Sequence, residues 1–249
     1  MKRVILALAA MFLSACVTVS QYPDYSELAS QVVPSNVQLL GTFTSWRTGE
    51  TKVDAVFCSG VVVSETQIIT AGHCVDSKEV RQPNGQIKVR LYDGRVVLAD
   101  VVKFSFSEVD NEHKDSALLE VKEGKLGKIA KKGDSRAMKQ GQQVAVVGNP
   151  AGEFTNSFTL GVLSYAYRSM TWGVYHQSDA LVIGGNSGGP VFNMQGELIG
   201  ILTRGGEGLS FFIPLDIFEA ELAVAGNKPY EELRHMAKRQ TKKSAGIVE

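Results

Sequence analysis

The stretch Gly185-Asn186-Ser187-Gly188-Gly189-Pro190 combines one hydroxyl side chain with three glycines and a proline. Glycine permits tight turns because it has no Cβ and adopts positive φ at little cost. A turn of this kind leaves backbone N–H groups uncovered, and two such donors can bind the oxyanion of a tetrahedral intermediate. A plain hairpin without chemistry is the alternative. The stretch predicts a backbone turn that presents Ser187. Whether this serine can act as a nucleophile depends on the other residues of the chain.

Two other short stretches contain the partners that a serine nucleophile needs. Thr70-Ala71-Gly72-His73-Cys74 carries a histidine, and Asp115-Ser116-Ala117-Leu118-Leu119 begins with an aspartate. A serine hydroxyl is a weak nucleophile unless a neighbouring base takes its proton. A neutral imidazole does this near pH 7, and a buried carboxylate orients it and stabilises the imidazolium. Taken singly, His73 could be a turn histidine and Asp115 a strand cap. Together the three stretches predict a His-Asp-Ser set.

The pattern around these stretches is that of an all-β protein. Short β-branched runs alternate with Gly, Asn and Asp turn signals from residue 37 to residue 214. No long amphipathic helix interrupts them, which favours a sandwich or barrel over an α/β sheet. The stretch 122–139 carries seven basic residues and fits either a solvated linker between two β halves or a binding patch. Strands are expected at 37–43, 55–63, 67–70, 87–91, 96–104, 117–121, 143–147, 157–167, 174–177, 198–202 and 209–213, and helices at 215–225 and 230–240.

These stretches resemble the trypsin-like (chymotrypsin-fold) serine peptidases. Within that superfamily the sequence is most similar to the Deg/HtrA type, because Gln177-Ser178-Asp179-Ala180, Gly148-Asn149-Pro150 and the stretch 196–201 also resemble segments of that family. The resemblance covers about residues 37–216. It implies two six-stranded antiparallel β-barrels with the active site between them, followed by a C-terminal helix. It also implies hydrolysis of peptide bonds in a protein or peptide substrate through an acyl-enzyme, with no cofactor.

The resemblance assigns roles residue by residue. His73 would be the general base, Asp115 would orient it, and Ser187 would be the nucleophile. The N–H groups of Gly185 and Ser187 would form the oxyanion hole. Thr203 would pair with the substrate backbone, and its hydroxyl would support Asp115.

The resemblance also outlines a specificity pocket. No Asp or Glu occupies the pocket position matched by Leu181, so a buried Lys or Arg of the substrate would lack a partner. We therefore expect cleavage after small or medium apolar residues. Arg204 could approach the substrate or face solvent. The expected lining is Leu181, Val182, Ile183, Thr203, Arg204, Gly205, Gly208 and Ser210.

Two further features of the chain bear on how the site is held. Cys58 and Cys74 match the disulfide that braces the catalytic histidine in animal trypsin-like enzymes, two free thiols being the alternative. Closing a loop of this length stabilises a fold by roughly 3 kcal/mol in the chain-entropy model. Asn186 replaces the aspartate that pairs with a newly cut N-terminus in secreted digestive enzymes. The oxyanion turn is therefore expected to be either preformed or ordered by ligand.

The N-terminal residues have the layout of a secretory signal. A basic start at Met1-Lys2-Arg3 is followed by an apolar run over 4–13, which is shorter than the roughly 20 residues that cross a bilayer. Leu13-Ser14-Ala15-Cys16 resembles the bacterial lipobox, in which the cysteine becomes a lipidated N-terminus, an ordinary signal peptide being the alternative. We expect an exported chain, lipid-anchored to a bacterial membrane on its outer-membrane or periplasmic side. The expected divisions are a signal peptide at 1–15, a tether at 16–35, a peptidase domain at 36–216 and a helical segment at 217–249.

Composition and length narrow the function classes. The 249 residues include 26 Lys plus Arg and 26 Asp plus Glu, and this zero formal charge argues against a nucleic-acid partner. No His, Cys and Asp cluster has the spacing of a metal site. The typical Deg/HtrA chain continues into a PDZ domain, but 35 residues follow Pro214 here, so no such domain is expected.

Two other interpretations stay open. An α/β-hydrolase would use residues 185–189 as its G-x-S-x-G elbow, with Asp216 and His235 following in that fold's order. That elbow must lead into a helix, whereas Gly188-Gly189-Pro190 leads into a short apolar run. The second alternative is a catalytically silent peptidase-fold binding module at the cell surface, because a fold alone does not establish activity.

Overall fold

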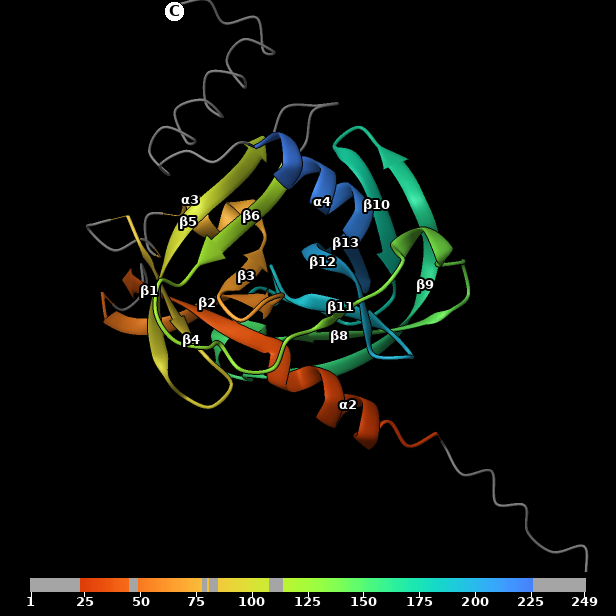
Figure 1. Ribbon diagram of the computed structural model, residues 1–249. Coiled ribbons are helices and arrows are strands. Elements are labelled where there is room, and N and C mark those ends of the chain that lie inside the picture. Colours follow the sequence, from red (N-terminus) through yellow and green to blue (C-terminus); the bar gives the residue numbers. More distant parts are fainter. Residues whose placement is uncertain (1–22, 45–48, 78–79, 81–84, 108–113, 226–249) are drawn as a thin grey trace, which may run out of the picture.

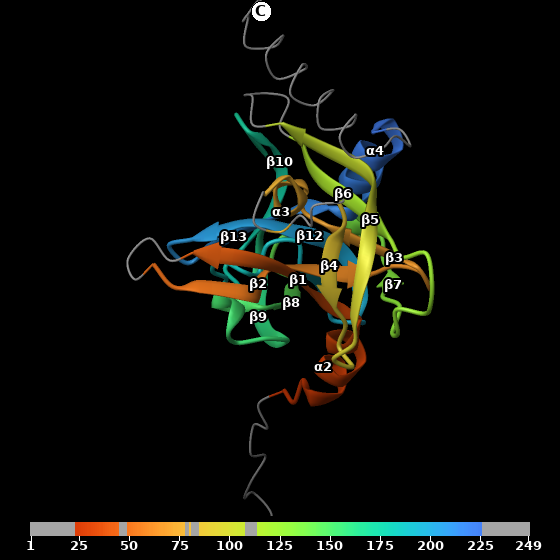
Figure 2. The same ribbon diagram turned by 90° about the vertical axis from the view of Figure 1, so that its left-hand side faces the viewer.

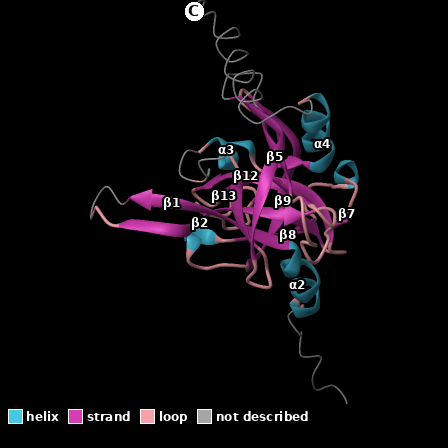
Figure 3. Cartoon of the chain, turned by 60° about the vertical axis from the view of Figure 1, so that its left-hand side comes forward, coloured by secondary structure: helices cyan, strands magenta, loops and turns pink. Residues whose placement is uncertain are grey.

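The computed structural model describes residues 23–44, 49–77, 80, 85–107 and 114–225. Strands dominate this part of the chain and form two antiparallel β-barrels side by side (Figures 1 and 3). A C-terminal helix follows the second barrel. The architecture predicted from the sequence is thus confirmed. No helix of the described residues combines the length and apolar character needed to cross a membrane.

The first barrel is a closed ring of six strands in the order β1-β2-β3-β6-β5-β4. Successive side chains of a strand point to opposite faces, so alternate residues enter the core. In β4, for example, Ile87 and Val89 are fully buried while Lys88 and Arg90 are not. The paired ends of β1 and β2 project from this barrel (Figure 3). The strands are β1 (Asn36–Thr44), β2 (Thr51–Val62), β3 (Gln67–Thr70), β4 (Ile87–Arg90), β5 (Val96–Ser107) and β6 (Lys114–Glu120).

The second barrel has the strand order β11-β8-β9-β10-β13-β12, and the pairing of β11 with β12 closes the ring. Phe192, Leu198 and Phe212 are among its fully buried side chains. A two-residue strand, β7, adds to β12 in parallel and lies in the lysine-rich connection between the barrels. Such a short strand leaves no pattern in the sequence. The strands are β7 (Lys131–Lys132), β8 (Gln143–Gly148), β9 (Ser157–Met170), β10 (Gly173–Ser178), β11 (Pro190–Asn193), β12 (Glu197–Gly206) and β13 (Leu209–Pro214).

The barrels pack directly on each other. Val61 of β2 and Ile69 of β3 belong to the same buried cluster as Tyr175, Ile201 and Ile213 of the second barrel. Strands β1 and β2 of the first barrel both contact β8 of the second (Figure 2). A shared apolar interface of this kind fixes the loops at the junction relative to each other.

The helices are short and lie outside the barrels. The helix α4 (Leu215–Val224) follows β13 and buries Phe218 and Leu222. The helix α3 (Gly72–Asp76), which carries His73, was not expected from the sequence. The described residues also contain three single turns of 3-10 helix: η1 (Val33–Ser35), η2 (Ser135–Ala137) and η3 (Pro150–Gly152).

The segment before β1 corrects one expectation. The tether predicted at 16–35 includes a helix, α2 (Ser26–Val32), that packs on the second barrel. Leu28 and Val32 lie one helical turn apart, and both are buried there. These two apolar side chains, four positions apart, follow the period of an amphipathic helix. The folded unit therefore begins before residue 36. The predicted signal peptide, Cys16, the tether before residue 23 and the C-terminal segment beyond residue 225 lie outside the described residues.

Candidate active site

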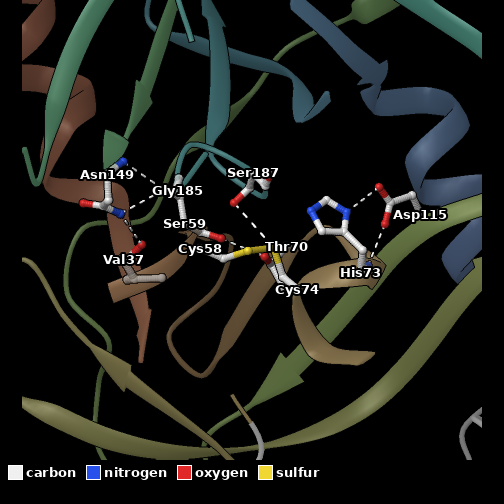
Figure 4. The surroundings of a disulfide bond; sticks show 10 residues. All are labelled: Val37, Cys58, Ser59, Thr70, His73, Cys74, Asp115, Asn149, Gly185 and Ser187. Atoms are coloured by element: carbon white, nitrogen blue, oxygen red, sulfur yellow. Dashed lines mark hydrogen bonds and ion pairs between the residues drawn. A yellow bond between two sulfur atoms is a disulfide. The ribbon is translucent and has the colours of Figure 1, made fainter. Parts of the chain in front are cut away.

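His73 and Asp115 form a tightly connected pair in the first barrel. His73 Nδ1 lies 2.8 Å from Asp115 Oδ2, and the His73 backbone N–H donates to Asp115 Oδ1 at 2.7 Å (Figure 4). The Asp115 side chain is 2% exposed and the His73 side chain 31%. Because a buried carboxylate accepts hydrogen bonds, Nδ1 is assigned the proton and Nε2 keeps its lone pair. An imidazole in this tautomer can take a proton at Nε2.

A glycine makes this geometry possible. At Gly72, which begins α3, a Cβ would lie 2.8 Å from the Ser105 carbonyl oxygen and 3.0 Å from the Ser116 backbone nitrogen. Any larger residue would therefore push α3 away from β5 and β6. The close approach brings the His73 N–H within reach of Asp115. This is the physical reason for a glycine directly before the histidine.

The predicted disulfide is present beside the histidine. Cys58 of β2 and Cys74 of α3 are bonded, with their Cα atoms 6.0 Å apart and both side chains buried. The bond ties α3 to the barrel wall. The ligand atoms of Cys58, Cys74 and His73 also lie within 4.8 Å of one another, the kind of cluster that can hold a metal ion. Both sulfurs are used in the disulfide, however, so this group offers no thiolate ligand in its oxidised form.

The nucleophile turn depends on glycine at two positions. Gly185 and Gly188 have φ values of +97° and +80°, in the left-handed region. A Cβ at Gly188 would collide with the Thr70 hydroxyl and the Ser59 carbonyl oxygen of the first barrel. A Cβ at Gly185 would collide with the Asn149 carbonyl oxygen. The turn is therefore packed on both sides by backbone and short polar side chains.

Ser59 holds both ends of this turn from the opposite barrel. Its backbone N–H donates to the Ser187 carbonyl at 2.8 Å, and its hydroxyl donates to the Gly185 carbonyl at 2.8 Å (Figure 4). The Asn149 backbone N–H and side-chain amide donate to the same hydroxyl at 3.0 and 2.9 Å. The sequence did not single out Ser59. Two sequence features could have pointed to Ser59: its position next to Cys58, and the resemblance of Gly148-Asn149-Pro150, which contains its partner, to a family segment.

The peptide bond between Gly184 and Gly185 has a fixed orientation. The Gly184 carbonyl accepts a hydrogen bond from the Ala151 N–H at 2.7 Å. In a trans peptide the carbonyl and the following N–H point in opposite directions, so the Gly185 N–H points away from the η3 loop. Within the described residues, neither this N–H nor that of Ser187 donates to a protein acceptor. Two backbone donors, the N–H groups of Gly185 and Ser187, are thus available at the turn.

The two halves of the predicted set meet at the junction of the barrels. In Figure 4 the His73 imidazole lies between the Asp115 carboxylate and Ser187. The Ser187 carbonyl oxygen is 3.6 Å from Cys74 Sγ, in the residue that follows His73. The structure therefore brings His73, Asp115, Ser187 and Gly185 together at one place.

A hollow of about 420 Å³ opens beside Ser187. The structure differs from the expected lining at Leu181, whose side chain is 69% exposed, and at Ser210, which is buried and donates to the Ser178 carbonyl at 3.2 Å. Gly208 is also absent from its walls. The Arg204 guanidinium lies 5.1 Å from the centre of the Trp172 ring, which forms a rim. The lining residues are Trp172, Val182, Ile183, Gly184, Ser187, Leu202, Thr203, Arg204, Gly205 and Phe211.

Among the described contacts, the Thr203 hydroxyl is not paired with Asp115. It donates to the Phe211 carbonyl at 3.4 Å instead. The pairing of β12 with β13 shifts register between Leu202 and Arg204, and this irregularity places Thr203 beside the Phe211 backbone. The support for Asp115 that was expected from Thr203 is therefore absent from the described contacts.

A site shared between two antiparallel β-barrels, with the histidine and aspartate on one and the serine turn on the other, is the architecture of chymotrypsin-type peptidases. The model of the trypsin-like peptidase domain family matches residues 58–201, which is more than half of the chain. The chain belongs to this family.

Similar proteins are of the DegP and HtrA kind. The chain is 37% identical over 166 residues to a DegP-like periplasmic serine endoprotease of Pseudomonas putida, covering 63% of this chain and 32% of that protein. It is 32% identical to the mitochondrial serine protease HTRA2 of Drosophila pseudoobscura pseudoobscura, covering 76% of this chain and 44% of the relative. The solved structure of the HtrA-type protease AlgW with a tripeptide superposes with a TM-score of 0.64 at 28% identity, covering 80% of this chain and 62% of that one. The chain thus spans about a third of the length of the bacterial relative.

Proposed function

We propose that the chain is a serine endopeptidase that hydrolyses peptide bonds through an acyl-enzyme. The observation that carries this proposal is the His73–Asp115 pair, with its 2.8 Å contact at Nδ1, placed beside Ser187. Ser187 Oγ attacks the carbonyl carbon while His73 Nε2 takes the hydroxyl proton. His73 then gives that proton to the leaving amine. In the second half of the reaction His73 takes a proton from the water that attacks the acyl-enzyme and returns it to Ser187 Oγ. Asp115 keeps the imidazole in its tautomer and stabilises the imidazolium.

The Gly185 and Ser187 N–H groups bind the developing oxyanion. The contact between the Ala151 N–H and the Gly184 carbonyl supports an oxyanion hole that is already formed without ligand. Donors that are oriented in advance need no reorganisation when charge develops, and losing one costs about 3–4 kcal/mol in the barrier. No cut N-terminus is required to order this turn.

The substrate is a protein or peptide that is cleaved after small or medium apolar residues. Val182, Ile183 and Phe211 support this preference because they give the hollow apolar walls. Arg204 is the charged residue of the lining, and its positive charge repels a substrate Lys or Arg.

The chain is exported, and it is anchored to a membrane through a lipid on Cys16. Two observations support export: the Cys58–Cys74 disulfide, since disulfides persist in oxidising compartments, and the periplasmic description of the DegP-like relatives. The lipobox-like stretch ending at Cys16 supports the anchor. Metabolic labelling with a clickable fatty acid tests it, with Cys16→Ser as the unlabelled control.

Cleavage-site profiling of a peptide library tests the activity, the nucleophile and the specificity together. Wild type is expected to cut after apolar residues, and Ser187→Ala is expected to cut nothing. Cuts mainly after Lys, Arg or Glu would contradict the specificity. Equal cleavage by Ser187→Ala would contradict the nucleophile.

A fluorophosphonate probe separates this proposal from the silent binding module. The probe reacts with an activated serine and is expected to label wild type but neither Ser187→Ala nor His73→Ala. If wild type stays unlabelled under conditions that label a control peptidase, the enzyme proposal fails.

A further inference from the structure

The strand that carries Asp115 runs past the end of its neighbour. The pairing of β3 with β6 ends at Thr70 and Ala117, two residues short of Asp115. The Asp115 backbone N–H donates instead to the Glu221 carboxylate of α4 at 3.1 Å. Figures 1 and 2 both show α4 beside the end of β6. The C-terminal helix thus supplies an acceptor that the sheet does not.

The Glu221 carboxyl is in an unusual environment. Burial, together with the negative charge of Asp115, raises its pKa to about 7. The Ser116 hydroxyl, the Asp115 N–H and the Lys114 ammonium oppose this shift, although the Ser116 hydroxyl does not meet hydrogen-bond geometry. The carboxyl therefore gains its charge near neutral pH, where a histidine also titrates.

The other charged groups nearby lie on the second barrel. The pKa of the Tyr175 phenol on β10 is raised, mainly by burial and also by the negative charges of Asp115 and Glu221. Arg204 of β12 opposes that shift. The charged or titratable groups that interact electrostatically with Glu221 are thus Asp115 and Lys114 on β6 and Tyr175 on β10, and Arg204 interacts with the phenol.

We propose that Glu221 is a positioning residue for the His73–Asp115 pair. Its carboxylate accepts a hydrogen bond from the Asp115 backbone N–H and so fixes the position of Asp115. Its negative charge makes the protonated form of His73 more stable. This inference rests on the proposed peptidase function, because His73 acts there as the base. It assigns to the C-terminal helix a part in the reaction that neither the triad nor the oxyanion hole requires.

The sign of the charge effect follows from Coulomb's law. Ionised Glu221 adds a negative charge near the imidazole, which favours the imidazolium and raises the pKa of His73. The base form of His73 is needed for attack, so the acidic limb of kcat/KM moves to higher pH when Glu221 ionises. Removing the charge moves that limb to lower pH. A shift of about 0.5–1 pH unit is expected, because the carboxylate and the imidazolium have opposite charges whose interaction is partly screened.

Two substitutions separate the hydrogen bond from the charge. Glu221→Gln keeps an acceptor for the Asp115 N–H but removes the charge. Glu221→Ala removes both. Glu219→Gln is the matched control, because Glu219 lies on the same helix and pairs with Lys132, away from Asp115.

The experiment measures the pH dependence of kcat/KM and, by NMR, the titration of the His73 imidazole. Glu221→Gln is expected to lower the His73 midpoint by about 0.5–1 unit and to keep kcat near that of wild type at pH 8. Glu221→Ala is expected to lower kcat by about tenfold, the effect of one lost hydrogen bond, and Glu219→Gln to change neither quantity. Unchanged His73 midpoints in Glu221→Gln would overturn the proposal, as would an equal shift in Glu219→Gln. The Gln variant keeps the test valid if the Ala variant fails to fold.

The NMR titration also separates this inference from the proposed function, because it requires no turnover. If wild type neither cleaves peptides nor reacts with a fluorophosphonate, the peptidase proposal fails. The coupling of Glu221 to the His73 titration is still measured in that case. A shifted midpoint would then support the electrostatic link, and an unshifted one would reject it.

Discussion

In the first barrel, His73 is held by a carboxylate and a covalent cross-link, whereas in the second barrel Ser187 is held by a turn whose glycines leave no space for side chains. The first arrangement uses the Asp115 hydrogen bonds of 2.7 and 2.8 Å and the disulfide at Cys74. The second uses backbone contacts to Ser59 and the close approach of Thr70 to Gly188.

These two kinds of support fail differently. The hydrogen bonds of Asp115 and the disulfide are separate restraints on the His73 segment, so removing one leaves the other in place. Close packing against backbone has no partial form, because a clash must move the turn and with it the oxyanion donors. Apart from Gly72, where a Cβ would also meet backbone atoms, the histidine side is therefore expected to tolerate substitution better than the serine side.

Gly188→Ala provides the most severe test of that comparison. The added Cβ would collide with Thr70 and Ser59, so the turn must shift and peptidase activity is expected to fall by about a thousandfold or more. Gly124→Ala is the control, since Gly124 has a similar φ of +88° but nothing within 4 Å of a Cβ. It should keep full activity and lose about 1–2 kcal/mol of stability from backbone strain alone. Activity assays and chemical unfolding measure both, and equal activity in the two variants would remove the steric argument.

The double substitution of Cys58→Ala and Cys74→Ala tests the opposite side. Removing the cross-link is expected to lower the free energy of unfolding by about 3 kcal/mol, since the 16-residue loop regains its freedom in the unfolded chain. Activity per folded molecule should fall far less than in Gly188→Ala, because Asp115 still holds His73. Denaturant unfolding and active-site titration give the two quantities. A loss of activity as large as that of Gly188→Ala would show that the two sides are supported alike.

The sequence was sufficient for features that depend on short local patterns. β-branched runs and turn glycines predicted an all-β sandwich or barrel, and the family resemblance implied two barrels. The stretches around His73, Asp115 and Ser187 predicted which residues come together. The Cys58–Cys74 pairing was also correct, through the family resemblance.

The features that the sequence did not reveal depend on contacts between distant residues. Ser59 acts on the nucleophile turn across the barrel junction, and Glu221 reaches Asp115 across 106 positions of the chain. The helix α2 was mistaken for a tether because two apolar residues in a polar stretch give a weak pattern. Leu181 and Ser210 were placed in the pocket by analogy, but the direction of a side chain depends on tertiary packing that a sequence match does not show.

Glu221 also links the site to stability, with a smaller expected effect. Its pKa is raised to about 7 in the folded state, so its contribution to stability is present below the unfolded value near 4.5 and is lost as the pH rises through 7. Wild type should therefore lose about 2 kcal/mol relative to Glu221→Gln between pH 4.5 and pH 8, a figure reduced from the full shift for partial exposure. Denaturant unfolding of both proteins at the two pH values measures the difference. A constant difference between them would mean that Glu221 does not titrate in this range.

Thr203→Val has the smallest expected effect and tests whether Asp115 in the first barrel depends on Thr203 in the second. The family resemblance gives the Thr203 hydroxyl to Asp115, whereas the structure gives it to the Phe211 carbonyl at a long 3.4 Å. Valine keeps the shape and removes this weak hydrogen bond, so stability should fall by about 0.5–1 kcal/mol. The His73 titration and kcat should stay within about twofold of wild type, because the lost hydrogen bond lies wholly within the second barrel. A tenfold loss of kcat with a shifted acidic limb would instead place Thr203 in the support of Asp115. The aspartate would then depend on the second barrel through β12 as well as on the C-terminal helix.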